Sequence, residues 1–238
     1  MLTENNFSKY LIYAIGEIIL VVIGILIALQ INTQNEYRKD RIYEKQALKE
    51  IYTSLKGDAG FNKEITTNIK RRDSAITYIL SFLNSGKIET DSIFAHNLKE
   101  SCLDNKINFD NGAYETLKSK GLQYVRNDSL RSLIVRTYEL AFPRTVFFGD
   151  EKRSDFVYEK KDVLLEILLD LDVVPEDKNF LITESITLNT TEKVTALKRL
   201  MYQQIELSMR YKELLDRQLI YINKLLLPIG KELEKLER

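Results

Sequence analysis

An unbroken apolar stretch from Tyr10 to Ile31 constrains this chain more than any other feature of its sequence. It reads YLIYAIGEIILVVIGILIALQI, and its only charged residue is Glu17. As a helix rising about 1.5 Å per residue, it is about 33 Å long, enough to cross a hydrocarbon core of about 30 Å. A cleaved signal peptide and a buried core helix are the alternatives, but the stretch is long and lacks a small-x-small exit. We predict a short segment 1–9, a transmembrane helix 10–31 and a soluble region 32–238.

The polar and small residues of the stretch gather on one face of the predicted helix. At 100° per residue, Glu17, Val21, Gly24 and Ala28 fall within an arc of about 100°. The Gly24-x-x-x-Ala28 step lets two helix backbones approach closely in lipid, and a carboxylate facing lipid is unfavourable. These four residues, here named the packing face, are predicted to contact a second copy or another membrane protein. The alternative is that Glu17 reaches the headgroups or Lys9.

The composition excludes several classes of function. Residues 1–32 hold two of the 35 acidic and one of the 35 basic residues, so the remainder carries a net charge of about +1. This balance argues against a nucleic-acid surface. Cys102 and His96 are the only residues of their types, which excludes an intrachain disulfide and argues against a zinc site. No phosphate-binding loop and no hydrolase or metalloprotease motif occurs. We therefore expect no cofactor and no enzymatic activity.

Apolar residues recur at helical spacing through most of the soluble region, and glycine and proline are few. We predict an all-α fold, in which the transmembrane helix precedes a helical bundle. Gly57–Gly60 is expected to break the first helix, Pro143 to end another, and Pro228 to end or kink the last. The expected elements are a long helical hairpin about 33–84, short capped helices about 91–142, a helix about 154–171 and a long helix about 191–227.

Helix caps are predicted at three places. Thr90 or Asp91 can cap the helix that follows Gly86, Asn127 can cap the one that follows Gly121, and Thr190 or Thr191 can cap the last. The side chains of these residues accept hydrogen bonds from the first free N–H groups of a helix. These positions therefore fix where the predicted helices begin.

The segment 111–121 is predicted to be a short helix, with Asp110 or Asn111 as its cap and Gly121 at its end. Tyr114, Glu115 and Lys118 are candidates to line a groove for a ligand or partner. The alternative is that capping and packing explain the whole segment.

Two segments carry a resemblance to a known family. FSKYLIYAIGEIILVVIGILIALQINTQNEYRK (7–39) and NGAYETLKSKG (111–121) resemble the signature segments of an uncharacterised family of single-pass membrane proteins from Bacteroidota. That family carries a domain-of-unknown-function label, so the resemblance implies no activity and no site residues. Its members often have a basic arm before the span and a Trp after it, and this chain has neither.

Two sequence signals bear on which side of the membrane the soluble region lies, and they point in opposite directions. Arg38, Lys39, Arg41 and Lys45 follow the span, which favours a cytoplasmic soluble region by the positive-inside rule. The resemblance implies the opposite, because a basic arm in relatives keeps the N-terminus inside. We expect a bacterial inner-membrane protein with a periplasmic C-terminal domain.

Two kinds of function fit these features. The first is a non-enzymatic sensor, scaffold or partner-binding module, anchored in the lipid bilayer and associating through its span. The alternative is a single-span subunit of an ion- or proton-linked complex that uses Glu17. The similarity to such subunits is one of layout only.

Overall fold

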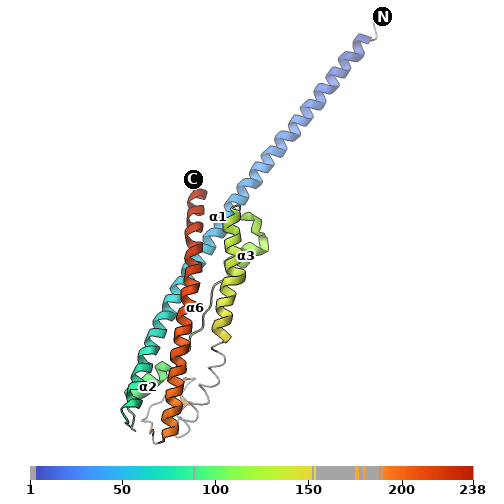
Figure 1. The fold of residues 1–238 in the computed structure, drawn as a ribbon. Coiled ribbons are helices and arrows are strands. Elements are labelled where there is room, and N and C mark those ends of the chain that lie inside the picture. Colours follow the sequence, from blue (N-terminus) through green and yellow to red (C-terminus); the bar gives the residue numbers. More distant parts are fainter. Residues whose placement is uncertain are drawn as a thin grey trace.

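The structure is a computed structural model that describes residues 4–87, 89–151, 153, 175–176, 179–180, 188 and 190–237. Its dominant element is α1 (Glu4–Asn84), a single helix of 81 residues. At about 1.5 Å per residue, α1 is about 120 Å long. Every side chain from Tyr10 to Lys39 is exposed, and this half of α1 projects away from the rest of the chain (Figure 1). By length and composition, α1 can cross a membrane.

The predicted break at Gly57–Gly60 is wrong, and with it the hairpin over 33–84. A glycine inside a helix is unfavourable by only about 1 kcal/mol relative to alanine. The apolar stripe of α1 continues on both sides of the glycines, since Ile51, Leu55 and Ile69 are all fully buried. Packing of this stripe against the bundle therefore outweighs the low helix propensity of two residues. The predicted end at Asn84 is confirmed, and Gly86 follows it with φ +73°.

Replacing Gly60 with alanine should stabilise the protein. Gly60 is exposed on α1, and a Cβ added there meets no atom within 4 Å. We expect Gly60→Ala to raise the free energy of unfolding by about 1 kcal/mol, because alanine loses less backbone entropy in a helix. Urea unfolding of the full chain in detergent micelles measures this. A destabilised variant would show that α1 is bent or broken at this position.

Shorter helices follow α1 in sequence. They are α2 (Ser92–Ser101), α3 (Gly112–Lys120), the 3₁₀ turn η1 (Leu122–Tyr124) and α4 (Asp128–Arg136). Two predicted caps are confirmed, because Asp91 accepts from the Phe94 N–H at 2.8 Å and Asn127 accepts from the Leu130 N–H at 3.1 Å. Gly121 ends α3 with φ +128°, a conformation that favours glycine.

The prediction that Pro143 ends a helix is also wrong. The π turn η2 (Thr137–Ala141) follows α4, and residues 142–151 continue as helix. The Phe142 N–H donates to the Thr137 carbonyl, five residues back. This wider turn comes directly before the proline, which has no N–H to donate, and Phe142 is fully buried. Burial and the π turn together carry the chain past Pro143.

The last helix, α6 (Thr191–Glu237), runs beside α1. The Thr190 hydroxyl accepts from the Lys193 N–H at 3.2 Å, which confirms that predicted cap. Pro228 does not end α6, because Leu225, three positions before it, and Ile229, directly after it, are fully buried in the core. The described strands are β1 (Pro175–Glu176) and β2 (Asn179–Phe180), an antiparallel pair of two residues each. The helix predicted over 154–171 lies outside the described residues.

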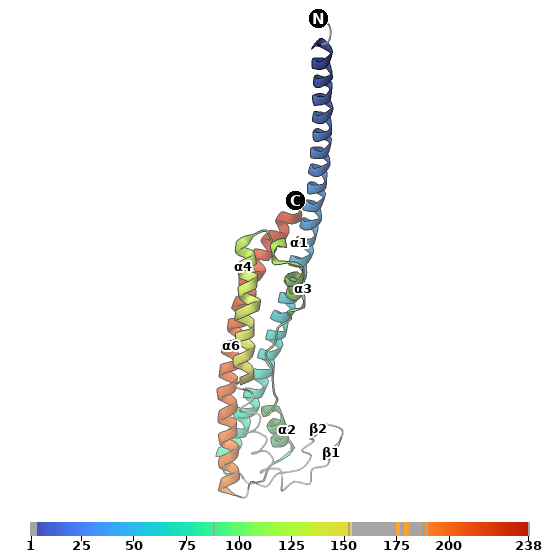
Figure 2. The same cartoon turned by 90° about the vertical axis from the view of Figure 1, so that its right-hand side faces the viewer.

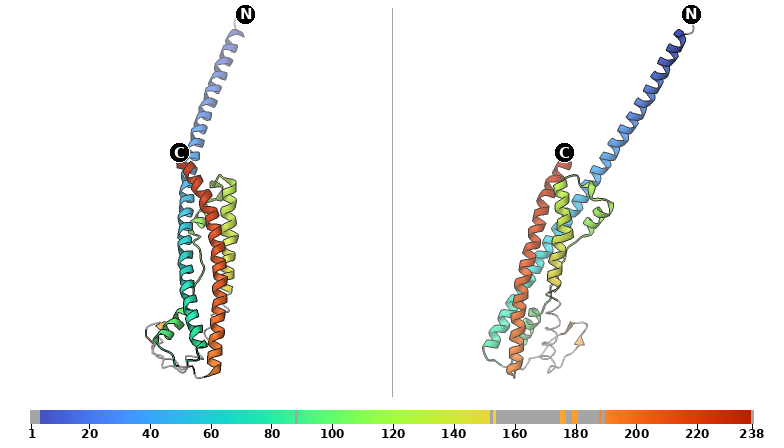
Figure 3. Two further views of the ribbon diagram at one scale, coloured as in Figure 1. Left: turned by 60° about the vertical axis from the view of Figure 1, so that its left-hand side comes forward. Right: turned by 45° about the vertical axis from the view of Figure 1, so that its right-hand side comes forward.

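The fold is all-α, as predicted: a long apolar N-terminal helix is followed by a bundle of helices. The lower half of α1, the helical run 128–151 and α6 lie side by side, with α3 against α1 and α2 at the far end (Figures 2 and 3). One core cluster lies toward the apolar end of α1 and includes Leu48, Tyr114 and Ile222. A second lies toward α2 and includes Ile76, Phe94 and Leu200.

Candidate functional site

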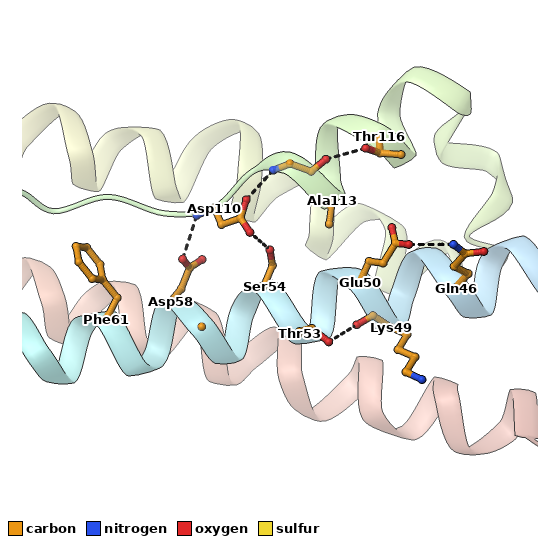
Figure 4. Close-up of a pocket in the computed structure, with 12 residues that line it drawn as sticks. Gln46, Lys49, Glu50, Thr53, Ser54, Asp58, Phe61, Asp110, Ala113 and Thr116 are labelled. Carbon is orange, nitrogen blue, oxygen red and sulfur yellow. Dashed lines mark hydrogen bonds between the residues drawn. The ribbon is translucent and has the colours of Figure 1, made fainter.

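A groove of about 710 Å³ lies between α1 and the first turn of α3 (Figure 4). Its α1 wall is polar or small except for Phe61, and its α3 wall begins with the loop residue Asp110. Glu50, Asp58 and Asp110 are its acidic residues, whereas Lys49 is its only cation. The groove is open to solvent along its length. It is lined by Gln46, Lys49, Glu50, Thr53, Ser54, Gly57, Asp58, Phe61, Asp110, Gly112, Ala113 and Thr116.

Asp110 holds the start of α3 against α1. Its Oδ1 accepts from the Gly112 N–H at 2.9 Å, and its Oδ2 accepts from the Ser54 hydroxyl. These hydrogen bonds, the one from Ser54 first, hold the pKa of the Asp110 carboxyl below its usual range. The Asp110 backbone N–H donates to Asp58 Oδ1 at 3.0 Å. One chain of hydrogen bonds therefore joins the α1 wall and the α3 wall of the groove (Figure 4).

Asp58 is the unusual residue of the groove. Its side chain is only 6% exposed, and its Oδ2 has no hydrogen-bond partner among the described residues. The pKa of Asp58 is raised to about 6, mainly because the side chain is buried; the hydrogen bond from the Asp110 N–H lowers it, and the nearby Asp110 charge raises it. Asn62, one turn later on α1, and the Tyr138 hydroxyl are also buried without partners in the described part of the chain. Buried polar atoms of this kind call for a bound water or ligand group.

The chemistry of the groove suits a group that donates hydrogen bonds. An ammonium or guanidinium in the groove would be attracted by the carboxylates of Glu50, Asp58 and Asp110, although Asp58 Oδ2 itself is shielded from solvent. Within the described residues, no three His, Cys, Asp or Glu side chains come close enough to hold a metal ion. A cationic side chain of a partner therefore fits the groove best.

The stability of the protein should depend on pH through Asp58. Its pKa is 3.8 without the fold and about 6 within it, so the folded state binds more protons between these values. Stability from this group is therefore lost as pH rises from about 4 to 7, by about 1–2 kcal/mol after allowance for solvent screening. Asp58→Asn should remove this loss and be more stable than the parent at pH 8.

The measurement is the difference in unfolding free energy between Asp58→Asn and the parent chain from pH 4 to pH 8. Taking the difference cancels the opposite contributions of Asp110 and Glu232, whose pKa values are lowered. Asp216→Asn, at an exposed position of α6, is the matched control and should give a flat difference. A flat difference for Asp58→Asn as well would rule out the raised pKa.

The predicted groove residues Tyr114, Glu115 and Lys118 do not line this groove. Tyr114 faces inward and is 2% exposed. Its ring stacks on Tyr138 at 4.7 Å, and its hydroxyl donates to Glu139 Oε1 at 2.8 Å. Lys118 Nζ lies 2.6 Å from the same oxygen, and Glu115 is exposed. The ion pair and hydrogen bond with Glu139 raise the pKa of Lys118, and together with the Tyr114 bond they lower that of Glu139.

The groove instead uses the other face of α3, with Gly112, Ala113 and Thr116. The predicted residues and the residues that line this groove are on different faces of α3, because the cap at Asp110 indicates where α3 begins and not which side meets α1. Asp58 was missed because it lies inside the expected helix break. A continuous helix through Gly57 would have placed Ser54 and Asp58 on one face, four positions apart.

The packing face lies on the projecting half of α1. Glu17, Val21, Gly24 and Ala28 are all exposed, and a Cβ added at Gly24 meets no atom within 4 Å. The face is therefore free in the single chain, and its partners remain a prediction.

Where α1 joins the bundle, the Glu44 side chain links α1 to the loop before α4. The Glu44 side chain is fully buried, and it accepts from the Arg126 N–H at 2.9 Å and from Arg41 Nη1 at 2.6 Å. The Arg126 guanidinium lies 3.9 Å from the centre of the Tyr37 ring and 4.0 Å from Asp40. The projecting half of α1 is thus attached to the bundle by charged and aromatic contacts.

Comparison with known proteins gives a family and nothing further. A family model described as "Family of unknown function (DUF6090)" matches residues 17–192. No curated protein matches the chain, and no solved structure does. The match spans the second half of the apolar stretch, the groove and α3.

Proposed function

This chain belongs to the DUF6090 family, a family of unknown function, and from its geometry we propose that it is a non-enzymatic, membrane-anchored module that binds a partner. One observation carries the proposal. The apolar segment, the packing face and the α1 wall of the groove all belong to one unbroken helix. Ala28 and Ser54 are about 39 Å apart along it, at about 1.5 Å per residue. A contact in the groove and a contact in the bilayer therefore act on the same rigid element.

The groove contributes the binding part of this proposal. Its carboxylates and the unpartnered oxygen of Asp58 favour a cationic side chain on a partner protein. Its small residues, Gly57 and Gly112 among them, leave room for a second backbone to approach. Nucleic acid is not the expected partner, because its phosphates would be repelled by the acidic lining.

The location of the protein is part of the proposal. We place residues 10–31 in the inner membrane of a bacterium of the Bacteroidota, in a single pass, with the bundle in the periplasm. The exposure of the apolar side chains supports the span, since Tyr10, Ile12 and Leu20 are each about 70% exposed or more. Protease added outside intact spheroplasts should cleave the bundle, and full protection would place the bundle in the cytoplasm.

Association through the packing face is tested by Gly24→Ile. In the proposed dimer or heteromer, a side chain at this position separates the two backbones and should weaken association by about tenfold. Gly16→Ile is the matched control, because Gly16 is equally open but lies outside the packing face. Crosslinking of the full chain in bilayers measures the effect. An unchanged oligomer in Gly24→Ile would count against the proposal.

The groove is tested by a photo-crosslinking side chain at Thr53 in native membranes. Thr53 lines the groove, whereas Lys63 is exposed on the same helix outside it. A product that forms from Thr53 and not from Lys63, and that is lost in Asp58→Lys, supports a cationic partner. Equal products from both positions would dismiss the groove as the binding site.

The second candidate function is a proton- or ion-linked role for Glu17. The observation that favours it is that Glu17 is exposed in the apolar segment, with no ion-pair partner in the described part of the chain. In such a complex the carboxylate would titrate against a multi-span partner. Glu17→Gln should then abolish function while leaving assembly intact. Normal growth with this variant would end the idea.

A further inference from the structure

A second, smaller pocket, which shares no lining residue with the groove, lies between the helical run 128–151 and α6. Its volume is about 200 Å³. Three arginines line it, Arg136 and Arg144 from the first helical run and Arg217 from α6, and no acidic residue does. Leu140, Phe148 and Tyr221 supply apolar and aromatic walls. The pocket thus combines concentrated positive charge with a surface for an apolar group.

The positive charges of these arginines are mostly not paired with carboxylates within the described part of the chain. Arg217 pairs with Glu213 at 2.7 Å, but Arg136 and Arg144 have no ion pair or hydrogen bond in the described part of the chain. Elsewhere in the bundle, Arg71 and Arg153 each pair with a carboxylate at 2.7 Å. Three guanidiniums around a small volume repel each other, and an anion removes that repulsion. A guanidinium also fits a carboxylate or phosphate with two parallel hydrogen bonds.

The π turn η2 aligns these side chains. In a regular helix, Arg136 and Arg144 would be about 80° apart, and Arg136 and Phe148 about 120° apart. A π turn adds one residue to one turn of the helix, which reduces both separations to about 20°. Arg136, Arg144 and Phe148 therefore form one line facing α6. Turns of this kind are frequent at functional sites, and here the turn includes Leu140 and Ala141 of the pocket wall.

The position of the pocket selects among anionic ligands. Lys45 pairs with Glu237 at 3.6 Å, so the end of α6 lies beside α1 about 21 Å beyond Ile31. From that end, α6 extends away from the apolar segment (Figure 1), and Tyr221 lies about 24 Å farther along it. A headgroup in a bilayer around residues 10–31 would have to leave the membrane by about 45 Å to reach it. A soluble anion can reach the pocket without this cost.

We propose that this pocket binds a soluble organic anion, a phosphate or carboxylate on a small apolar body. Arg136, Arg144 and Arg217 hold the oxyanion, and Phe148 and Tyr221 contact the apolar body. The arginine pocket is separate from the groove, so its ligand is distinct from the partner protein proposed for the groove.

The test uses the full chain in phosphatidylcholine nanodiscs, with calorimetric titration of phenyl phosphate and of inorganic phosphate. We expect saturable binding of phenyl phosphate, weakened about tenfold or more by Arg136→Gln and by Arg144→Gln. Arg199→Gln, at another exposed arginine of α6, is the matched control and should bind normally. Phe148→Ala should weaken phenyl phosphate and leave inorganic phosphate unchanged. Because Arg136 and Arg144 make no ion pair or hydrogen bond in the described part of the chain, both variants should unfold at the parent temperature without ligand.

Three outcomes overturn the proposal. The first is that phenyl phosphate does not bind, and the second is that it binds equally well to Arg136→Gln and Arg144→Gln. The third is that the arginine variants lose binding only to phosphatidylglycerol vesicles, which would make the pocket a membrane contact. Equal affinity for both phosphates, unaffected by Phe148→Ala, would remove the apolar body from the ligand.

Discussion

Ser208→Ala is expected to destabilise the protein by about 2–4 kcal/mol, although it removes a single hydroxyl. The reason is Arg72, which lies on α1 and is 1% exposed. Its Nη2 and Nε donate to Ser208 Oγ at 2.8 and 3.2 Å, and its Nη1 donates to the Leu103 carbonyl at 3.3 Å. Burial lowers the pKa of Arg72, which reports how poorly the site tolerates the charge. Without the hydroxyl, two donors of a buried cation lose their acceptor.

In the described part of the chain, Arg72 makes no hydrogen bond to a carboxylate, although the charges of Asp73 and Asp104 lie close enough to oppose the lowering of its pKa. The adjacent Asp73 is paired with Lys212 Nζ at 2.6 Å. The hydrogen bonds of Arg72 therefore go to neutral acceptors. Loss of the Ser208 hydroxyl should lower the stability of the protein more than loss of an ordinary serine hydroxyl.

A double-mutant cycle separates this effect from a simple loss of packing. Arg72→Met removes the charge and keeps most of the side-chain volume, so it should change stability by less than Ser208→Ala does. In the Arg72→Met background, Ser208→Ala should be nearly neutral. Urea midpoints of the full chain in detergent micelles give the four values. If Ser208→Ala destabilises both backgrounds equally, the hydroxyl acts through packing and the explanation fails.

The sequence predicts those parts of the fold that depend on local signals. The apolar stretch 10–31, the end of α1 at Asn84 and the caps at Asp91 and Asn127 all follow from residues within one or two turns. Each of these features has its physical cause beside it in the chain. Local chemistry and the folded structure agree at these positions.

The errors arise where distant packing outweighs a local signal. Gly57 and Gly60 predict a break in the helix, but buried residues before and after them keep α1 continuous. Pro143 and Pro228 predict helix ends, but the fully buried residues Phe142 and Ile229 beside them hold the helix. In each case a local penalty of about 1–3 kcal/mol competes with the burial of several large side chains.

The candidate sites are harder to predict, because their residues meet only in three dimensions. Asp58 meets Asp110 across 52 positions, and Arg72 meets Ser208 across 136. The arginine pocket depends on a π turn, for which the sequence shows no signal beyond the following proline. Such pairs leave no local pattern in a single sequence.

The prediction with the largest expected effect is for Tyr114, in the segment that resembles the family signature. Tyr114→Ala should lower the free energy of unfolding by about 3–5 kcal/mol, because it removes a buried aromatic ring from a packed core. The ring lies parallel to Tyr138, at 8°, within the core cluster near the apolar end of α1. Tyr138 also contacts the ring of Phe142 at 5.3 Å, so the cavity would reach the π turn region.

Tyr114→Phe tells packing apart from a role of the hydroxyl in binding. It keeps the stacked ring and removes only the bond to Glu139, which still has Lys118. We expect a loss of about 0.5–1.5 kcal/mol and an unchanged crosslink from Thr53 in the groove. Urea unfolding and the crosslink together give the answer. A stable Tyr114→Phe variant that loses the crosslink would assign the hydroxyl to binding. A small loss of stability with an intact crosslink would instead show that Tyr114 acts by packing, which holds α3 in position and so determines the shape of the groove.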